Sequence, residues 1–164
     1  MDYKFVLADE TMLDDIFELY VQRITWMDMM GIKQWNVTEY TEVYPIEYYK
    51  KQIDDKRLYV MVADVKVIGS IVLLENDNRW EDNDECLAYY LHNFVTDVSV
   101  KGIGKEILLL VENLALENNK TRLRLDCASD NVFLNSYYEQ AGYCYVGECI
   151  EGLYIGNKRE KKLK

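Results

Sequence analysis

The feature of this sequence that most restricts its fold is the block at residues 101–143, where a paired-glycine turn precedes a helix, a strand and a second helix. Gly102 and Gly104 form the turn, which follows a hydrophobic strand. The next strand lies at 121–127, and the helical pattern returns at 131–141. This order predicts an α/β chain in which helices pack against a sheet.

The glycine turn has the chemistry of a phosphate-binding site. Glycine lacks a Cβ, so its backbone adopts positive φ and approaches a ligand closely. The helix that begins there presents unpaired N–H groups and the positive end of its dipole. Lys101 and Lys105 add positive charge on either side. A bare helix-opening turn has the same pattern, so the glycines alone leave both interpretations open.

The same block resembles two motifs of the GNAT superfamily of acyl-CoA-dependent N-acetyltransferases. The first motif, (Gln/Arg)-x-x-Gly-x-(Gly/Ala), corresponds to Ser99–Gly104, with Ser99 where the family prefers Gln or Arg. One bacterial branch also carries Leu-His before the turn, as at Leu91-His92. The second motif, Asn-x-x-Ala-x-x-Leu-Tyr-x-x-x-Gly-Phe, is matched in spacing by Asn131, Leu134, Tyr137, Tyr138, Gly142 and Tyr143.

The resemblance implies an α/β (α+β) GNAT fold as a single domain over residues 1–164. Such a domain has a mixed, mostly antiparallel sheet of six to seven strands, with one splayed parallel pair, flanked by about four helices. The strands at 86–96 and 121–127 are expected to form the parallel pair. The tail at 158–163 is expected to be the last, antiparallel strand.

The resemblance also implies acetyl-CoA as the acyl donor. The pantetheine arm is expected to pair with backbone groups of Phe94, Val95 and Thr96. Asn131 matches the position that bonds the pantetheine amides, and a helix N-cap is the alternative role for this residue. The coenzyme's pyrophosphate is expected at the backbone N–H groups of the turn, formed by Val100, Lys101, Gly102, Ile103, Gly104 and Lys105.

Tyr138 matches the general acid of the family, which protonates the departing thiolate. Its alternative role is packing, which we expect for the neighbouring Tyr137. The incoming ammonium must lose a proton, and an imidazole suits this step because its ordinary pKa is near 6.5. His92 is the candidate base; a satisfied core histidine, Asp97, Glu85 or a water relay are alternatives.

Two other classes of function are weighed against an N-acetyltransferase that acts on a small-molecule or peptide amine. The first is a non-catalytic acyl-CoA-binding or sensing module, which would share the glycine turn and Asn131. An intact Tyr138 favours the enzyme. The second is a P-loop or dinucleotide fold, which is disfavoured because Lys105 is followed by Glu106 rather than Ser or Thr.

The composition limits the classes of binding partner and the cellular compartment that we expect for this protein. A net charge of −10 on 164 residues repels nucleic-acid phosphates, so no nucleic acid is expected. No apolar run has membrane-spanning length, and the start of the chain lacks a signal-peptide layout, so we expect a cytoplasmic protein without a membrane partner. One histidine and four cysteines without Cys-x-x-Cys spacing disfavour a metal site. A homodimer is left open.

The N-terminal half is expected to supply the acceptor pocket, as it does in the family. Helical patterns at 10–30 and 45–55 follow an edge strand, and a hairpin is expected at 57–74. Trp35 and Trp80 are candidate substrate contacts, with burial in the core as the alternative. In the strand at 121–127 two arginines alternate with leucines, which predicts one solvent-facing side.

Overall fold

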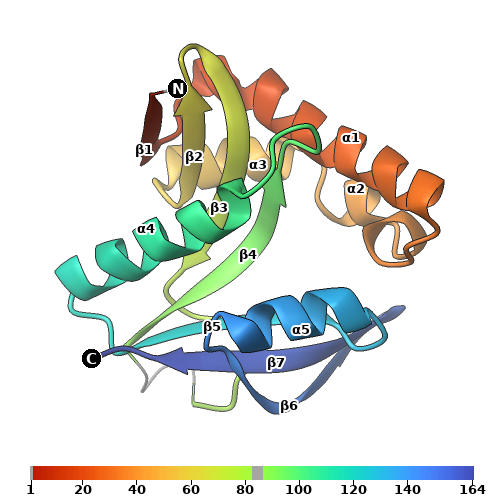
Figure 1. Cartoon of the computed structure of the whole chain (residues 1–164), viewed down its shortest axis with the longest axis vertical. Coiled ribbons are helices and arrows are strands. Elements are labelled where there is room, and N and C mark those ends of the chain that lie inside the picture. The colour runs from red at the N-terminus through yellow and green to blue at the C-terminus, as the bar shows by residue number, and fades with distance from the viewer. Residues whose placement is uncertain (1, 83–86) are drawn as a thin grey trace. The chain divides into compact units, whose positions relative to one another are not determined.

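The computed structural model describes residues 2–82 and 87–164, which form an α/β sheet structure (Figure 1). Its strands follow the order β1-β2-β3-β4-β5-β7-β6. The described residues fall into two compact units. The first unit comprises residues 1–73 and 93–108, and the second comprises 74–92 and 109–164. The prediction of one domain stays a prediction.

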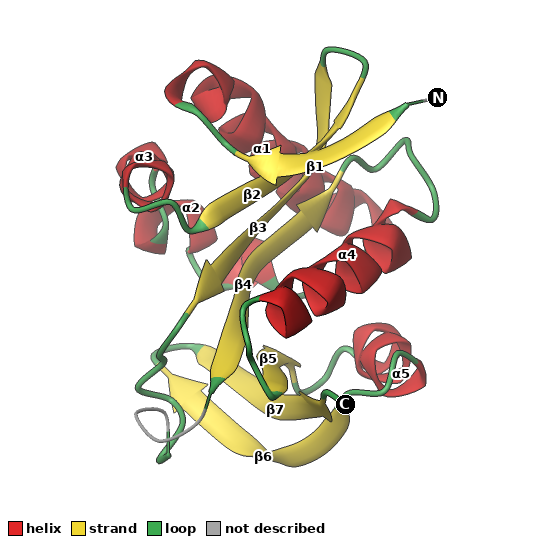
Figure 2. Cartoon of the chain, turned by 90° about the vertical axis from the view of Figure 1, so that its left-hand side faces the viewer, coloured by secondary structure: helices red, strands yellow, loops and turns green. Residues whose placement is uncertain are grey.

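In the first unit β1 pairs antiparallel with β2, and β2 pairs antiparallel with β3 (Figure 2). The edge strand is β1, as predicted, and β2 turns into β3 through Asp64, which has φ 54°. The fourth strand, β4, runs through both units. The bounds are β1 Tyr3–Leu7, β2 Leu58–Ala63, β3 Lys66–Leu74 and β4 Ala88–Thr96.

The helices of the first unit lie close to the predicted ranges. Gly31 ends α1 in the left-handed conformation, with φ 69°. Two short helices inside the predicted loop after residue 31 were missed, because a single turn carries no periodic signal. The helices are α1 Leu13–Met30, α2 Tyr40–Val43 and α3 Ile46–Asp54, with one-turn 3-10 helices η1 Glu10–Met12 and η2 Trp35–Val37.

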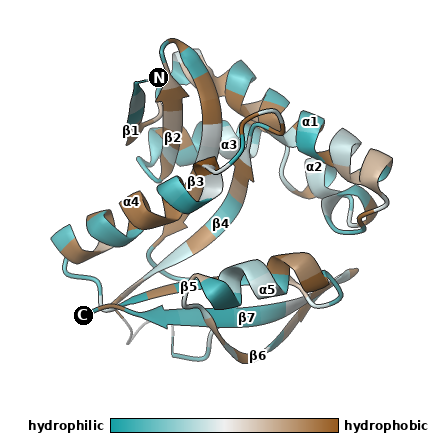
Figure 3. Ribbon diagram, in the orientation of Figure 1, coloured by the Kyte–Doolittle hydropathy of each residue, from teal (hydrophilic) through white to brown (hydrophobic). Residues whose placement is uncertain are grey.

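The second unit contains the predicted parallel pair. Three residues of β4, Ala88–Tyr90, pair with Arg122–Arg124 of β5. The last strand, β7, pairs antiparallel with both β5 and β6, and Figure 3 shows its largely hydrophilic colour. Helix α4 begins in the first unit and continues into the second. The bounds are α4 Ile103–Glu117, β5 Arg122–Ala128, α5 Val132–Gln140, β6 Cys144–Glu151 and β7 Tyr154–Lys162.

The predicted fold class is confirmed. The described residues form a mixed, mostly antiparallel sheet of seven strands with one parallel pair, flanked by five α-helices. None of the described helices is long and apolar enough to cross a membrane.

The prediction of a solvent-facing side on β5 is wrong for Arg124, whose residue surface is 3% exposed. Its guanidinium donates to Asp82 at 2.8 and 2.9 Å and to Glu160 at 2.8 Å. The hydroxyl of Tyr90 lies 3.0 Å away, and the ring of Trp80 stacks on the guanidinium with its centroid at 4.4 Å. Acidic partners from two other segments therefore compensate for the burial of this cation.

Gly69 allows the first turns of α4 to approach β3. A Cβ built on Gly69 would lie 2.4 Å from Cδ1 of Ile107, a side chain that is fully buried. The sheet is also irregular at this glycine, because the β2–β3 register shifts between Met61, which faces Gly69, and Val62, which faces Val67. Close packing and the bulge both explain a glycine inside this strand.

We predict that Gly69→Ala destabilises the protein by about 1–3 kcal/mol through overpacking. Ile107→Val removes the clashing Cδ1 atom at a cost of its own of about 0.5–1.5 kcal/mol. In the double variant the alanine should therefore cost less than it does alone. Denaturant unfolding of the four proteins measures this coupling, and strictly additive free energies would contradict the packing role.

Candidate functional site

One of the two glycines of the turn, Gly102, has the expected positive φ. Gly102 has φ 84°, and a Cβ built on it would meet nothing within 4 Å. Backbone conformation rather than crowding therefore requires glycine there. Helix α4 begins at the next residue, so Gly104 lies in its first turn, whose N–H groups have no partner within the helix. Lys101 and Lys105 are both exposed. This arrangement is suited to binding a phosphate.

Asp97 holds the segment that leads into this turn. Its carboxylate accepts from the Ser99 amide at 2.9 Å and from the Ser99 hydroxyl at 2.7 Å, and it pairs with Lys66 at 2.7 Å. Burial alone would raise the pKa of Asp97, but these hydrogen bonds outweigh it and lower the pKa to about 2. The structure therefore gives Asp97 a role in holding the turn.

The expected pantetheine segment Phe94–Thr96 is the last part of β4. The carbonyl of Thr96 accepts from Nη2 of Arg23 at 2.8 Å, and the same nitrogen lies 3.0 Å from the Thr96 hydroxyl. Arg23, on α1, therefore fixes the end of this strand within the first unit. The sequence analysis missed this role, because nothing in the helical pattern distinguishes Arg23 from other polar residues of α1.

Helix α5 positions Asn131 and Tyr138. The Asn131 side chain accepts from the amide of Leu134 at 3.0 Å, so the alternative role as N-cap is confirmed. The ring of Tyr138 packs edge-on against Tyr137 and Tyr143, with centroids at 5.4 and 5.8 Å. Burial, followed by the nearby thiol of Cys127, raises the pKa of Tyr138 well above its ordinary value. The phenol is therefore protonated at neutral pH, as an ordinary tyrosine is, and burial makes it a weaker acid than an exposed tyrosine.

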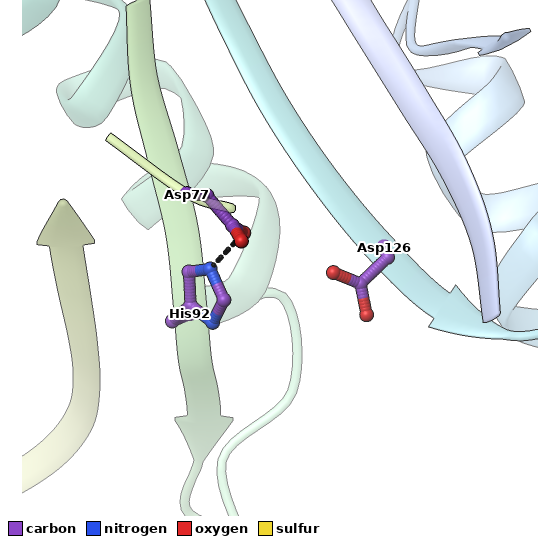
Figure 4. Close-up of side chains that lie close together, drawn as sticks. All are labelled: Asp77, His92 and Asp126. Atoms are coloured by element: carbon purple, nitrogen blue, oxygen red, sulfur yellow. Dashed lines mark hydrogen bonds and ion pairs between the residues drawn. The ribbon is translucent and has the colours of Figure 1, made fainter. Parts of the chain in front are cut away.

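The His92 side chain forms a hydrogen bond with Asp77, which lies in the loop before β4 (Figure 4). The distance from His92 Nε2 to Asp77 Oδ2 is 2.7 Å, and the side chains are 12% and 9% exposed. Asp126 on β5 points toward the same imidazole. One N or O atom from each of the three side chains lies within 4.8 Å of the others.

The third member of this cluster is already paired with a cation. Arg79 donates to Asp126 Oδ2 at 3.0 Å and to Glu151 at 2.7 Å, and the Tyr154 hydroxyl donates to Asp126 Oδ1 at 2.6 Å. Carboxylate and imidazole are metal-ligand groups. A metal ion here would be repelled by the Arg79 guanidinium, so we interpret the cluster as a hydrogen-bonded ion-pair network.

Trp35, a candidate substrate contact, is half-buried in the first unit. It stacks on Tyr40 with centroids 4.4 Å apart. The hydroxyl of Tyr40 in turn accepts a hydrogen bond from Nδ2 of Asn93 at 2.6 Å. The hydroxyl of Tyr48 donates to Oδ1 of Asn93 at 2.8 Å. Asn93 lies within β4 and has φ 52°, a left-handed conformation. The result is an aromatic cluster with a polar amide at its centre.

Trp80, the other candidate contact, is 5% exposed. Its indole lies against Arg124 on one side and near Lys158, whose Nζ is 5.1 Å from the ring centroid. This packing favours the core role over substrate contact. Glu85, an alternative base, lies outside the described residues.

A sequence model of the acetyltransferase (GNAT) family matches residues 29–143, more than half of the chain. The chain belongs to the GNAT acetyltransferase family. The uncharacterized N-acetyltransferase YesJ of Bacillus subtilis is 25% identical across 88% of this chain and 83% of that protein.

Solved GNAT structures share the fold of this chain. A GNAT acetyltransferase from Listeria monocytogenes has a TM-score of 0.80 at 22% identity, covering 98% of this chain and 95% of that one. The PaiA N-acetyltransferase from Thermoplasma acidophilum, solved in complex with coenzyme A, has a TM-score of 0.76 at 21% identity, covering 99% of each chain. The resemblance noted in the sequence is thus confirmed as family membership.

The GNAT motifs did not predict the partners of His92. Asp77 belongs to the acidic loop of residues 75–85, whose composition is that of solvent-exposed surface. Asp126 belongs to β5, which the sequence analysis considered only as a partner of β4 in the parallel pair. The parallel register supplies the signal, because Tyr90 pairs with Arg124, and His92 and Asp126 are each two residues further along. Residues two apart on a strand share a face.

We predict that Asp97→Asn destabilises the protein by about 1–2 kcal/mol at neutral pH, because a folded-state pKa near 2 lies below the ordinary value of 3.8. The depressed pKa stabilises the fold above pH of about 4, and this contribution is lost as the pH falls toward about 2. Unfolding free energies of the two proteins should converge in acid. An unchanged difference across this range would contradict the assignment.

Proposed function

We propose that this chain transfers an acetyl group from acetyl-CoA to a primary amine of a small molecule or peptide, by direct attack of the amine on the thioester. Family membership supports acetyl transfer in general. The observation that carries the finer proposal is Tyr138, which lies at the family's general-acid position on α5, with Asn131 at the cap of the same helix.

The proposed chemistry assigns separate tasks to separate residues. The turn at Val100–Lys105 binds the pyrophosphate through backbone N–H groups. Backbone groups of Phe94–Thr96 pair with the pantetheine and polarise the thioester carbonyl. Asn131 contacts the pantetheine in addition to capping its helix. His92 takes a proton from the incoming ammonium, and Tyr138 gives one to the leaving thiolate.

The acceptor is proposed to contact the aromatic cluster that contains Trp35. Aromatic rings bind an ammonium group or its apolar body. The acidic loop before β4 is less suited to attracting a cation than its composition suggests. Within the described residues, Glu75 pairs with Lys120, Asp77 with His92, and Asp82 with Arg124.

The alternative function is a non-catalytic acyl-CoA-binding or sensing module of the same fold. Such a module needs the turn and Asn131 but has no use for a proton donor at the leaving sulfur. Tyr138 therefore separates the two proposals by experiment.

For the enzyme, we predict that Tyr138→Phe lowers kcat by about a hundred- to ten-thousand-fold while leaving acetyl-CoA affinity unchanged. The matched control is Tyr137→Phe, which removes the neighbouring hydroxyl from the same helix and should retain kcat. Steady-state kinetics with an identified amine, together with calorimetry, measures both effects. Wild-type turnover in Tyr138→Phe would make Tyr138 a packing residue.

We predict that Gly104→Val weakens acetyl-CoA binding at least tenfold, which is about 1.4 kcal/mol, because a branched side chain would occupy the proposed pyrophosphate position. Gly104→Ala, with a smaller side chain, should lose less affinity. Titration calorimetry on variants whose folding is checked by thermal unfolding makes the comparison. Equal affinities in all three proteins would place the coenzyme elsewhere.

A further inference from the structure

We propose that Asp77 is a positioning residue that fixes the tautomer of His92, so that Nδ1 of the imidazole accepts the proton of the incoming amine. The inference rests on the proposed amine acetylation. It adds a residue from a loop that no motif identifies.

Both oxygens of Asp77 have defined partners. Oδ1 accepts from the backbone amide of Arg79 at 3.0 Å, and Oδ2 lies 2.7 Å from Nε2 of His92. The turn that Arg79 closes therefore sets the direction of the carboxylate. An ionised carboxylate only accepts hydrogen bonds, so Nε2 must carry the proton. In the neutral ring the lone pair is then on Nδ1.

Asp77 stays ionised while it does this. Burial alone would raise the pKa of Asp77, but the hydrogen bond from His92 and the ring's charge outweigh burial and lower the pKa. A carboxylate that remains charged stabilises the imidazolium that forms when His92 accepts a proton. The same pairing of carboxylate and imidazole orients the base in hydrolytic triads.

The other carboxylate beside the ring is poorly suited to be the base. Both oxygens of Asp126 accept hydrogen bonds, one from the cation of Arg79 and one from Tyr154. Among the described residues, Nδ1 of His92 makes no hydrogen bond. It is therefore the basic atom of this cluster that is available to a substrate.

Charged groups from four elements surround the imidazole. Asp77 and Asp126 carry negative charge, and Arg79, which lies between Asp126 and Glu151, carries positive charge. The titratable and charged groups of the cluster include Asp77 and Arg79 from the loop after β3, Asp126 from β5, Cys149 and Glu151 from β6, and Tyr154 and Lys158 from β7.

The proton balance of the reaction closes with these groups. An ammonium acceptor gives one proton to Nδ1 of His92 and becomes a nucleophilic amine. The amine attacks the thioester carbon, the carbon–sulfur bond breaks, and the sulfur leaves as thiolate. The thiolate takes a proton from Tyr138, the second proton of the attacking nitrogen restores the tyrosine, and His92 releases its proton to solvent.

The test compares the wild-type protein with Asp77→Asn by NMR of the His92 ring nitrogens. His92 is the only histidine, so its nitrogen NMR signals are assigned without ambiguity in the full-length protein. In the variant the single amide oxygen is needed by the Arg79 backbone, so the amide NH₂ faces Nε2. An NH₂ donor requires an unprotonated Nε2 and thus shifts the proton to Nδ1.

We expect the wild-type spectrum to show the Nε2–H tautomer and Asp77→Asn to show predominantly Nδ1–H. We also expect kcat of the variant to fall at least tenfold, because Nδ1 then carries a proton and cannot accept one from the ammonium. The control is Glu75→Gln, the same carboxylate-to-amide change in the same loop, where Glu75 is exposed and its partner is Lys120. It should leave both the tautomer and kcat unchanged.

Each outcome decides one part of the proposal. An unchanged tautomer in folded Asp77→Asn would overturn the positioning role. A changed tautomer with a wild-type kcat would show that His92 is not the base, and it would overturn the catalytic half. If the wild-type protein acetylates no amine, the proposed function and the base role fail together, whereas the spectra still decide whether Asp77 orients the ring.

Discussion

The buried guanidinium of Arg124 is the interaction on which the second unit depends. It joins β5 to Glu160 on β7, to Tyr90 on β4 and to Asp82 of the loop before β4. A buried cation is costly unless its hydrogen bonds are satisfied, so the three elements must keep their positions relative to β5. That requirement sets the parallel register in which Tyr90 faces Arg124, and it holds one end of the acidic loop.

The position of the candidate base follows from the same register. Two residues beyond Tyr90 and Arg124, the strands place His92 and Asp126 at corresponding positions, where ladder pairing between β4 and β5 is no longer formed within the second unit. The loop that Arg124 anchors through Asp82 also supplies Asp77 and Arg79, which bond His92 and Asp126. A structural ion pair and the proposed catalytic network therefore draw on the same loop.

Much of the fold could be predicted because its signals are local or specific to the family. Gly102 was recognised from the turn it forms, and its positive φ bears this out. The hairpin expected at 57–74 contains β2 and β3, because two hydrophobic runs flank a short turn. Asp77 and Arg124 could not be understood this way, because the importance of each depends on a partner distant in sequence. The alternation of arginine and leucine indicated an exposed face, and only the tertiary partners Asp82 and Glu160 show why Arg124 is buried.

For the same reason, only some residues of the candidate site could be identified from the sequence. Tyr138 and Asn131 lie on one helix at motif spacing, so a sequence comparison finds them together. The proton acceptor has no such motif, and the lone histidine had equally good interpretations as a core residue. Its bond to a carboxylate that is itself held by the Arg79 amide is what distinguishes it.

The most direct test of the account is a product measurement on the wild-type protein, incubated with acetyl-CoA and a panel of small-molecule and peptide amines. Mass spectrometry of the amines and a thiol assay of the coenzyme would be followed together. The account predicts at least one amine that gains an acetyl group in equal amount to the coenzyme A released. Tight binding of acetyl-CoA without release of coenzyme A for any amine would contradict it and would identify the chain as a binding module.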